Sequence, residues 1–221
     1  MKRILSVAVV LGALGGLALA GPFEDGAAAF TAGDFSKALS SWRMLADAGD
    51  ARGQFNLGIL HDRGQGVGQD RAEALKFYRL AAEKGDAIAA FNLGDMYSQG
   101  EGAQKNAEEG VRWYRVAAEK GDVLAHYQLG LILSEGRGVP QDYAEAANWY
   151  EQAANKKHAL SQANLATLYA NGQGVEQDLG KAAEWSERAS DAGMSGESNT
   201  SCSSQRSAQM LEQCRRIVPR M

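Results

Sequence analysis

Three features that would assign this chain to a familiar functional class are missing from its sequence. Basic residues do not outnumber acidic ones, and a formal net charge of −4 argues against nucleic acid as a partner. No second apolar run follows the one at the amino terminus, so no membrane span is expected in the mature chain. Cysteine is scarce too, since the only two cysteines lie near the carboxyl end. What remains, 45% hydrophobic and 23% charged residues, is typical of a soluble folded domain.

Catalytic motifs are missing as well. The sequence has no Ser-x-x-Lys of a serine β-lactamase, no His-Glu-x-x-His and no Gly-x-Ser-x-Gly nucleophile elbow. The run Gly64-x-Gly66-x-Gly68 resembles a phosphate-binding loop, but it has counterparts along the chain and no Gly-Lys-Ser or Gly-Lys-Thr follows it. We therefore predict that the protein is not an enzyme and has no cofactor.

The first 20 residues have the three-part layout of a secretory signal peptide. Two basic residues precede an apolar run over residues 4–19, which ends at the small-residue site Ala18-Leu19-Ala20. The run is shorter than the ~20 residues that a membrane anchor needs. Cleavage after Ala20 would place the mature chain in an oxidising compartment, as a periplasmic or secreted bacterial protein.

An internal repeat of 36 residues occupies most of the chain. Four units follow one another without a gap: residues 51–86, 87–122, 123–158 and 159–194. Each unit has a leucine, a glycine pair, an Asp or Asn and an aromatic stretch at fixed positions, which in the first unit are Leu57, Gly64, Gly66, Asp70 and Phe77-Tyr78. A fixed period of this size is typical of a solenoid.

Each unit is predicted to form two helices. Apolar residues at spacings of three and four, such as Leu57 and Leu60, indicate the first helix. The glycine pair ends that helix because glycine readily adopts positive φ. Asp70 lies three residues before Glu73, which is capping-box spacing, and we expect the two residues to cap the second helix reciprocally. The same spacing occurs at Asn106 with Glu109 and at Asp142 with Glu145.

Different segments flank the four units. Residues 21–50 look like a tetratricopeptide unit and are predicted to form an N-terminal capping helix pair. After the last unit, residues 195–221 are predicted to form a polar loop and a closing helix, with Leu211, Cys214 and Val218 on one side. Terminal caps of this kind are expected in repeat arrays.

The recurring positions resemble those of the SLR (Sel-one-like repeat) family of the tetratricopeptide-like superfamily. The resemblance covers residues 51–194, with single departures at Ala103, Asn106, Ser186 and His158. It implies an all-α, right-handed α-solenoid of helix-turn-helix repeats, usually an adaptor or assembly platform and in bacteria often exported. A cysteine-rich subgroup of the family is linked with β-lactam binding, but the cysteine pair that it carries in each repeat is absent here.

Histidines and tryptophans are assigned to packing. His61, His126 and His158 occupy three different positions of the repeat, so stacking would not bring them together as metal ligands. We predict no metal site. One repeat position, in contrast, carries all three tryptophans of the units, which is typical of a conserved packing role within a core: Trp113, Trp149 and Trp185.

A partner-binding face is predicted from the first helices. Four positions of each helix point away from the core leucine at ~100° per residue, and by resemblance to tetratricopeptide arrays they line the concave face. The predicted partner-binding residues are Arg52, Asn56, Ile59, Ile88, Asn92, Asp95, Leu124, Gln128, Leu131, Leu160 and Asn164.

An amide recurs at one of these positions, in Asn56, Asn92, Gln128 and Asn164. Amides can pair with a peptide backbone, and outward apolar side chains usually become covered, so a protein or peptide partner is favoured. The alternative is that the amides brace neighbouring repeats. For the whole chain, the alternative function is an envelope protein that binds or hydrolyses β-lactams or peptidoglycan.

The two cysteines, Cys202 and Cys214, lie outside the repeats. Export predicts one disulfide between them. A straight helix would separate their Cα atoms by ~18 Å, beyond the ~7 Å limit, so the chain must turn back near residues 203–206. A buried thiol or a bond between chains is the alternative.

Overall fold

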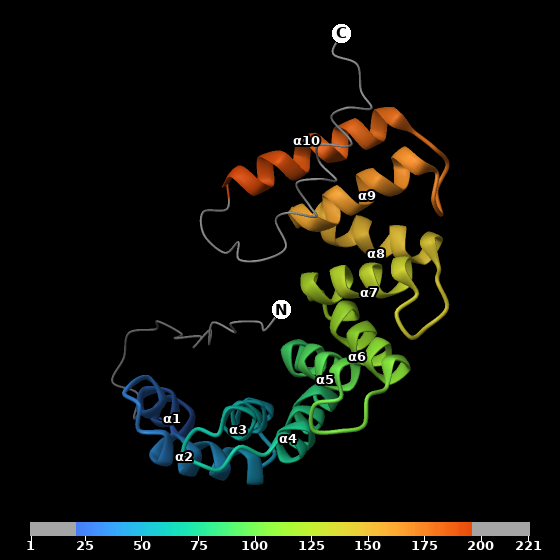
Figure 1. Ribbon diagram of the computed structural model, residues 1–221. Coiled ribbons are helices and arrows are strands. Elements are labelled where there is room, and N and C mark those ends of the chain that lie inside the picture. Colours follow the sequence, from blue (N-terminus) through green and yellow to red (C-terminus); the bar gives the residue numbers. More distant parts are fainter. Residues whose placement is uncertain (1–20, 196–221) are drawn as a thin grey trace. The chain divides into compact units, whose positions relative to one another are not determined.

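The computed structural model describes residues 21–195, and all its regular elements there are helices (Figure 1). The predicted signal peptide and both cysteines lie outside these residues. The chain divides between Asn106 and Ala107 into two compact units. Unit 1 contains α1 (Pro22–Thr31), α2 (Phe35–Asp47), α3 (Ala51–Arg63), α4 (Arg71–Glu83) and α5 (Ala87–Gln99). Unit 2 contains α6 (Ala107–Glu119), α7 (Val123–Glu135), α8 (Tyr143–Asn155), α9 (Ala159–Asn171) and α10 (Leu179–Ser195).

Helices pack in sequence order within each unit. In unit 1, each of α1 to α4 packs against the helix that follows it, and in unit 2 each of α6 to α9 does the same. The first helix of every 36-residue repeat begins at the first residue of that repeat, and the second follows one glycine-rich loop later. The prediction of an all-α array of helix pairs is therefore confirmed. No helix among residues 21–195 is long and apolar enough to cross a membrane.

The first glycine of each pair ends a first helix in the left-handed region. These four C-cap residues have φ between 66° and 78°, and the N–H of each donates to a carbonyl four residues back: Gly64, Gly100, Gly136 and Gly172. This φ is unfavourable for residues with a side chain. The predicted role of the first glycine is confirmed.

The second glycine lets the loop lie directly on the preceding repeat. A Cβ atom on Gly102 would be 2.3 Å from the Arg71 carbonyl oxygen, and one on Gly174 would be 2.2 Å from the Tyr143 carbonyl carbon. Neither contact leaves room for a side chain. The other two loops make the same approach, Gly66 to Phe35 and Gly138 to Ala107. Each loop therefore rests on the first residue of the second helix before it.

A small residue in the first helix makes room for a ring in the second. A Cβ atom on Gly58 would lie 2.6 Å from the Tyr78 ring, and one on Gly130 would lie 2.6 Å from the Tyr150 ring. In the fourth repeat the small residue is Ala166 and a serine, Ser186, replaces the tyrosine; both are buried. The two departures of this repeat therefore compensate each other across one helix pair.

Acidic residues cap most of the described helices, and at Asp70 and Asp142 this was predicted. The side chain of Asp70 accepts from the Glu73 amide at 2.9 Å, and that of Asp142 accepts from the Glu145 amide at 2.8 Å. The prediction that Glu73 and Glu145 cap these helices reciprocally is wrong, however. The backbone N–H of each cap donates instead to the end of the preceding helix: Asp70 to the carbonyl of His61 at 2.9 Å and Asp142 to that of Leu133 at 3.0 Å. With that amide already paired, Glu73 forms an ion pair with Lys76.

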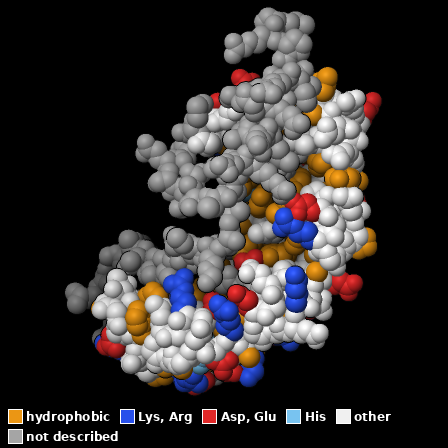
Figure 2. All heavy atoms as spheres, viewed as in Figure 1, with side chains coloured by type: hydrophobic (Ala, Val, Ile, Leu, Met, Phe, Trp, Pro, Cys, Tyr) orange, Lys and Arg blue, Asp and Glu red, His pale blue; other side chains and the backbone are white. Residues whose placement is uncertain are grey.

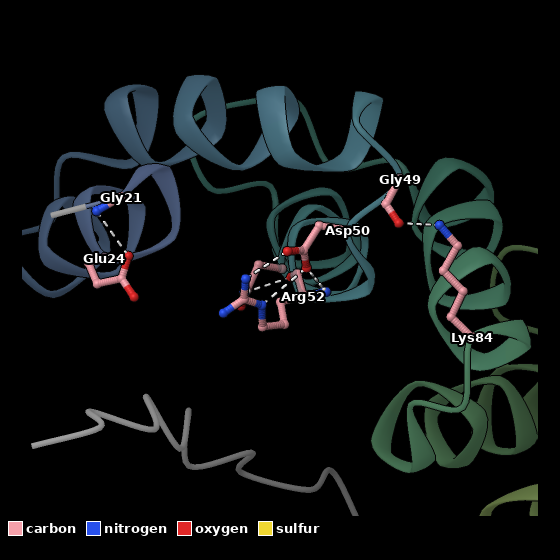
Figure 3. Close-up of polar contacts among 7 residues, drawn as sticks. Gly21, Glu24, Gly49, Asp50, Arg52 and Lys84 are labelled. Atoms are coloured by element: carbon pink, nitrogen blue, oxygen red, sulfur yellow. Dashed lines mark hydrogen bonds and ion pairs between the residues drawn. The ribbon is translucent and has the colours of Figure 1, made fainter. Parts of the chain in front are cut away.

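Contacts between successive second helices follow the same register. Figure 3 shows Lys84 of α4 donating to the carbonyl of Gly49, beyond the end of α2. Two repeats later the same contact returns: the Lys156 ammonium donates to the Gly121 carbonyl at 2.9 Å. The lysine ammonium groups thus hydrogen-bond to carbonyl groups just beyond helix ends, where the helix dipole favours a cation.

Candidate interaction surface

The predicted binding residues of unit 1 are largely closed off. Asn56, Ile59 and Asn92 are buried, with 8%, 3% and 7% exposed, so their predicted outward placement is wrong. The prediction treated a first helix as packed on one side, whereas α3 packs against both α2 and α4. Ile88 remains 38% exposed, and Asp95 is half-buried.

Arg52 is exposed, but it is occupied by the cap of its own helix. Its guanidinium lies 2.7 Å from the Asp50 carboxylate, which also accepts the Arg52 backbone amide at 2.8 Å (Figure 3). The hydrogen bond from Arg52 lowers the pKa of Asp50. The Arg52 guanidinium also lies 4.6 Å from the centre of the Phe23 ring of α1. This arginine therefore joins α1 to α3.

The matching residues of unit 2 are more open. All five predicted residues of α7 and α9 are partly exposed: Leu124, Gln128, Leu131, Leu160 and Asn164. Figure 2 shows hydrophobic side chains reaching the surface in the region of α7. Three leucines and two amides thus share the outward positions of two first helices. We call these five residues the α7/α9 face.

Two of the four amides lie against a tyrosine of the preceding second helix. Asn92 of α5 lies beside Tyr78 of α4, and Asn164 of α9 lies beside Tyr150 of α8; each amide opposes the rise in the pKa of its tyrosine. Burial raises the pKa of both phenols, so they stay neutral. Asn56 makes a local bond instead, donating to the Arg52 carbonyl at 2.9 Å. The placement of Asn92 and Asn164 beside these tyrosines favours the bracing interpretation at both positions.

An ionic and aromatic cluster braces unit 2. The Arg115 guanidinium of α6 lies 2.5 Å from the Glu145 carboxylate of α8, and the indole N–H of Trp149 donates to the same carboxylate at 2.9 Å. The ring of His126 in α7 packs 5.6 Å from the Trp149 ring. Arg115 holds the pKa of Glu145 below its ordinary value. Because Arg115, Glu145 and Trp149 satisfy one another, the arrangement is structural.

Aromatic residues of the second helices pack as predicted. Trp113 and Trp185 are buried, and Trp149 is half-buried. The Trp113 indole donates to Glu109 at 2.9 Å, in the same way that Trp149 donates to Glu145. This i to i−4 bond satisfies the indole N–H that burial would otherwise leave unpaired.

The three histidines lie in three unrelated environments. His61 stacks on Phe77 with 5.5 Å between ring centres, His126 packs on Trp149, and His158 caps α9. Burial lowers the pKa of all three. Within residues 21–195, no group of three or more His, Cys, Asp or Glu side chains is arranged to hold a metal ion.

Small hollows lie beside two of the glycine loops. The hollow in unit 2, about 380 Å³, is lined by Tyr169, Val175, Glu176, Gln177, Asp178 and Lys181. Its counterpart in unit 1 is lined by Tyr97, Ala103, Gln104, Lys105 and Asn106. Neither lining contains a histidine, serine or cysteine. Each hollow lies between the glycine loop and the tyrosine near the end of the first helix, Tyr169 in unit 2 and Tyr97 in unit 1.

Sequence reasoning missed three exposed apolar residues: Met44, Leu80 and Leu179, with 59%, 42% and 46% exposed. Met44 and Leu80 lie 36 residues apart, on α2 and α4. Applying the 36-residue register to the outer face of the second helices would have identified this pair. Leu179, the first residue of α10, carries no such signal in the sequence.

The helix pairs, their loop packing and their partly apolar outer positions define a helical-repeat protein. The repeat has a known identity: the sequence profile of the Sel1 repeat matches residues 51–86, 87–122, 123–158 and 159–194. Since these matches cover more than half of the chain, it belongs to the Sel1 repeat family. No functionally curated protein matches the chain.

Two solved structures are similar in sequence and fold. A protective antigen of uropathogenic Escherichia coli strains that displays an SLR fold is 36% identical, with a TM-score of 0.69. The match covers 72% of this chain and 34% of the antigen, so this chain spans about a third of that structure. A Sel1 repeat protein from Oxalobacter formigenes is 29% identical, with a TM-score of 0.66, and the match covers 88% of this chain and 85% of the other.

Proposed function

We propose that the protein is an exported, non-catalytic scaffold that holds a protein or peptide partner on the α7/α9 face. The observation that carries the proposal is the partial exposure of Leu124, Leu131 and Leu160 on neighbouring repeats of one unit. Exposed apolar side chains that gather on one surface commonly mark an interaction site. Gln128 lies between two of these leucines along α7.

The chemistry of this face suits a partner with apolar side chains and an accessible backbone. Full burial of a leucine contributes about 1.5–3 kcal/mol, and these leucines are already half-buried, so each offers a fraction of that. The amides of Gln128 and Asn164 each carry a donor and an acceptor. A single amide hydrogen bond contributes only ~0.5–1.5 kcal/mol, so the leucines supply most of the affinity.

Export is part of the proposal and rests on the amino-terminal sequence. Basic residues, an apolar run and the site Ala18-Leu19-Ala20 favour cleavage after Ala20. The intact mass of the exported protein tests it, because retention of residues 1–20 on the soluble exported species would contradict the cleavage.

The binding proposal is tested by removing the leucines together. The partner is first recovered by crosslinking in the native compartment, and its affinity is then measured for the variant Leu124→Ala/Leu131→Ala/Leu160→Ala. We expect a loss of ~10-fold or more, equivalent to ~1.4 kcal/mol. The control variant Met44→Ala/Leu80→Ala removes exposed apolar side chains from second helices of unit 1 and should bind normally.

Unchanged binding by the triple variant, with its helical spectrum intact, would place the partner elsewhere. The non-catalytic part of the proposal has its own test. Turnover of the β-lactam nitrocefin, or binding of muropeptides by the purified mature chain, would favour the envelope-enzyme alternative instead.

A further inference from the structure

Among residues 21–195, the second helix of the last repeat lacks the cover that each earlier second helix receives. The first residue of each earlier second helix lies under the glycine loop of the next repeat: Phe35, Arg71, Ala107 and Tyr143. Leu179 holds the same position in α10, no described loop follows it, and it is 46% exposed. Figure 1 shows α10 at the end of unit 2, next to α9.

Two further residues of α10 extend this open surface. Ala183 is half-buried, whereas its counterparts in the first three repeats are buried: Leu75, Val111 and Ala147. Ser190 is also half-buried, whereas its counterparts are only 1–3% exposed: Ala82, Ala118 and Ala154. At ~100° per residue, Leu179, Ala183 and Ser190 fall within ~40° of one another around the helix. We call these three residues the end face.

Residues 197–221 cannot cover the end face with a fifth repeat of the same kind. The loop that would do so needs a glycine for its close approach, as at Gly102 and Gly174. Residues 197–221 contain no glycine. The occupant must therefore pack in another way.

We propose that the C-terminal segment, residues 207–218, packs as a helix along the end face, with Leu211 and Val218 against Leu179 and Ala183. The intervening residues 196–206 can span up to ~36 Å when extended. The 17 residues of α10 extend ~26 Å. The chain can thus return along the whole of α10.

Charge favours this segment over a second copy of the protein. Residues 176–191 carry five acidic and two basic side chains, while residues 207–221 carry one acidic and three basic side chains. Complementary charge favours docking of the segment, whereas residues 176–191 of two copies, both acidic, would repel each other. Covering Leu179 also removes a surface on which copies could stack end to end.

A photo-crosslinking residue in place of Leu179, in the full mature chain, tests the contact directly. We expect intramolecular crosslinks to residues 207–218, mapped by mass spectrometry. The same residue in place of Arg188 is the matched control, since position 188 lies ~180° around α10 from position 179; it should not reach the segment. Crosslinks from position 179 to a second copy, or none to residues 207–218, would overturn the proposal.

A double-variant cycle gives an independent readout. If the two leucines touch, Leu179→Ala/Leu211→Ala should lower the melting temperature no further than the more damaging single variant. Fully additive shifts in melting temperature would show that the two side chains do not interact. Alanine is a good helix former, so both single variants should leave the helical spectrum unchanged.

Discussion

The two units follow one repeat pattern but differ in what they expose on their first helices. In unit 1, Asn56, Ile59 and Asn92 are buried, and Arg52 is held by Asp50. In unit 2 the corresponding leucines and amides remain partly exposed. The comparison shows that the positions that build the repeat are shared, whereas the positions that offer a surface are specific to each unit.

The junctions between repeats differ in a similar way. At the end of the first and second repeats a glycine and an aspartate stand together, as in Gly121-Asp122, and the aspartate caps the next first helix. At the end of the third repeat these residues are Lys157 and His158. Lys157 has a φ of 63° and is the only described non-glycine residue with positive φ. His158 caps α9 through a ring nitrogen that accepts the Ser161 amide at 3.3 Å.

The largest expected effect tests whether both units rely on the same loop packing. Gly66→Ala should destabilise unit 1 and Gly174→Ala unit 2, each by ~2–4 kcal/mol, because the new Cβ would meet backbone of the preceding repeat at 2.5 Å or less and the φ is positive. Hydrogen exchange resolved by helix measures this. Gly193→Ala is the control, since nothing lies within 4 Å of its Cβ position. If each variant lowered hydrogen-exchange protection equally in both units, the prediction that each loop stabilises its own unit would be contradicted.

A smaller effect is expected at the pairing of a small residue with a ring. Gly130→Ala places a methyl group 2.6 Å from the Tyr150 ring, and overpacking of this kind costs about 1–3 kcal/mol. The double variant Gly130→Ala/Tyr150→Ser should lose less stability than the sum of the two single variants, because the methyl group then meets no ring, as the fourth repeat combines Ala166 with Ser186. Urea denaturation of the single and double variants measures it. If the double variant loses the sum of both single effects, the two positions do not compensate.

The smallest expected effect concerns pH and the His158 cap. Burial lowers the pKa of His158, so the unfolded chain binds a proton at higher pH than the folded one. The contribution of this histidine is present above its unfolded pKa of ~6.5 and is lost as pH falls through the lower folded value. The cap is lost with it, since an imidazolium has no free acceptor nitrogen and lies unfavourably at a helix N-terminus. The ring also faces Tyr127 of α7, 4.9 Å away, and the neighbouring Lys156 and Lys157 are cationic.

His158→Asn keeps a capping acceptor but does not titrate, so stability should fall less between pH 7.5 and 5.5 than in the wild type. An N-cap is worth ~0.5–2 kcal/mol, which limits the effect. His61 and His126 titrate in the same direction and are the internal background. If the stability of His158→Asn fell with pH as steeply as that of the wild type, the His158 cap would not contribute to the pH dependence.

Most of the fold could be predicted from the sequence, because its repeat carries the information four times. The start of each first helix, the glycine C-caps and the aspartate caps all follow from local chemistry at recurring positions. Much less of the candidate surface could be predicted. The predicted outward placement was wrong at Asn56, Ile59 and Asn92. Burial depends on the neighbours on both sides of a helix, whereas a helical wheel takes account of only one side.

The sequence by itself determined the period, the helix pairs and their ends, since backbone angles and capping depend on residues a few positions apart. Only the tertiary structure decided why the second glycine is needed, which amides lie beside a tyrosine, and that Leu179 is left exposed. Those properties depend on contacts between repeats. The close approach of Gly174 to Tyr143, 31 residues earlier in the chain, has no local cause, because it exists only once the loop of one repeat lies on the helix of another.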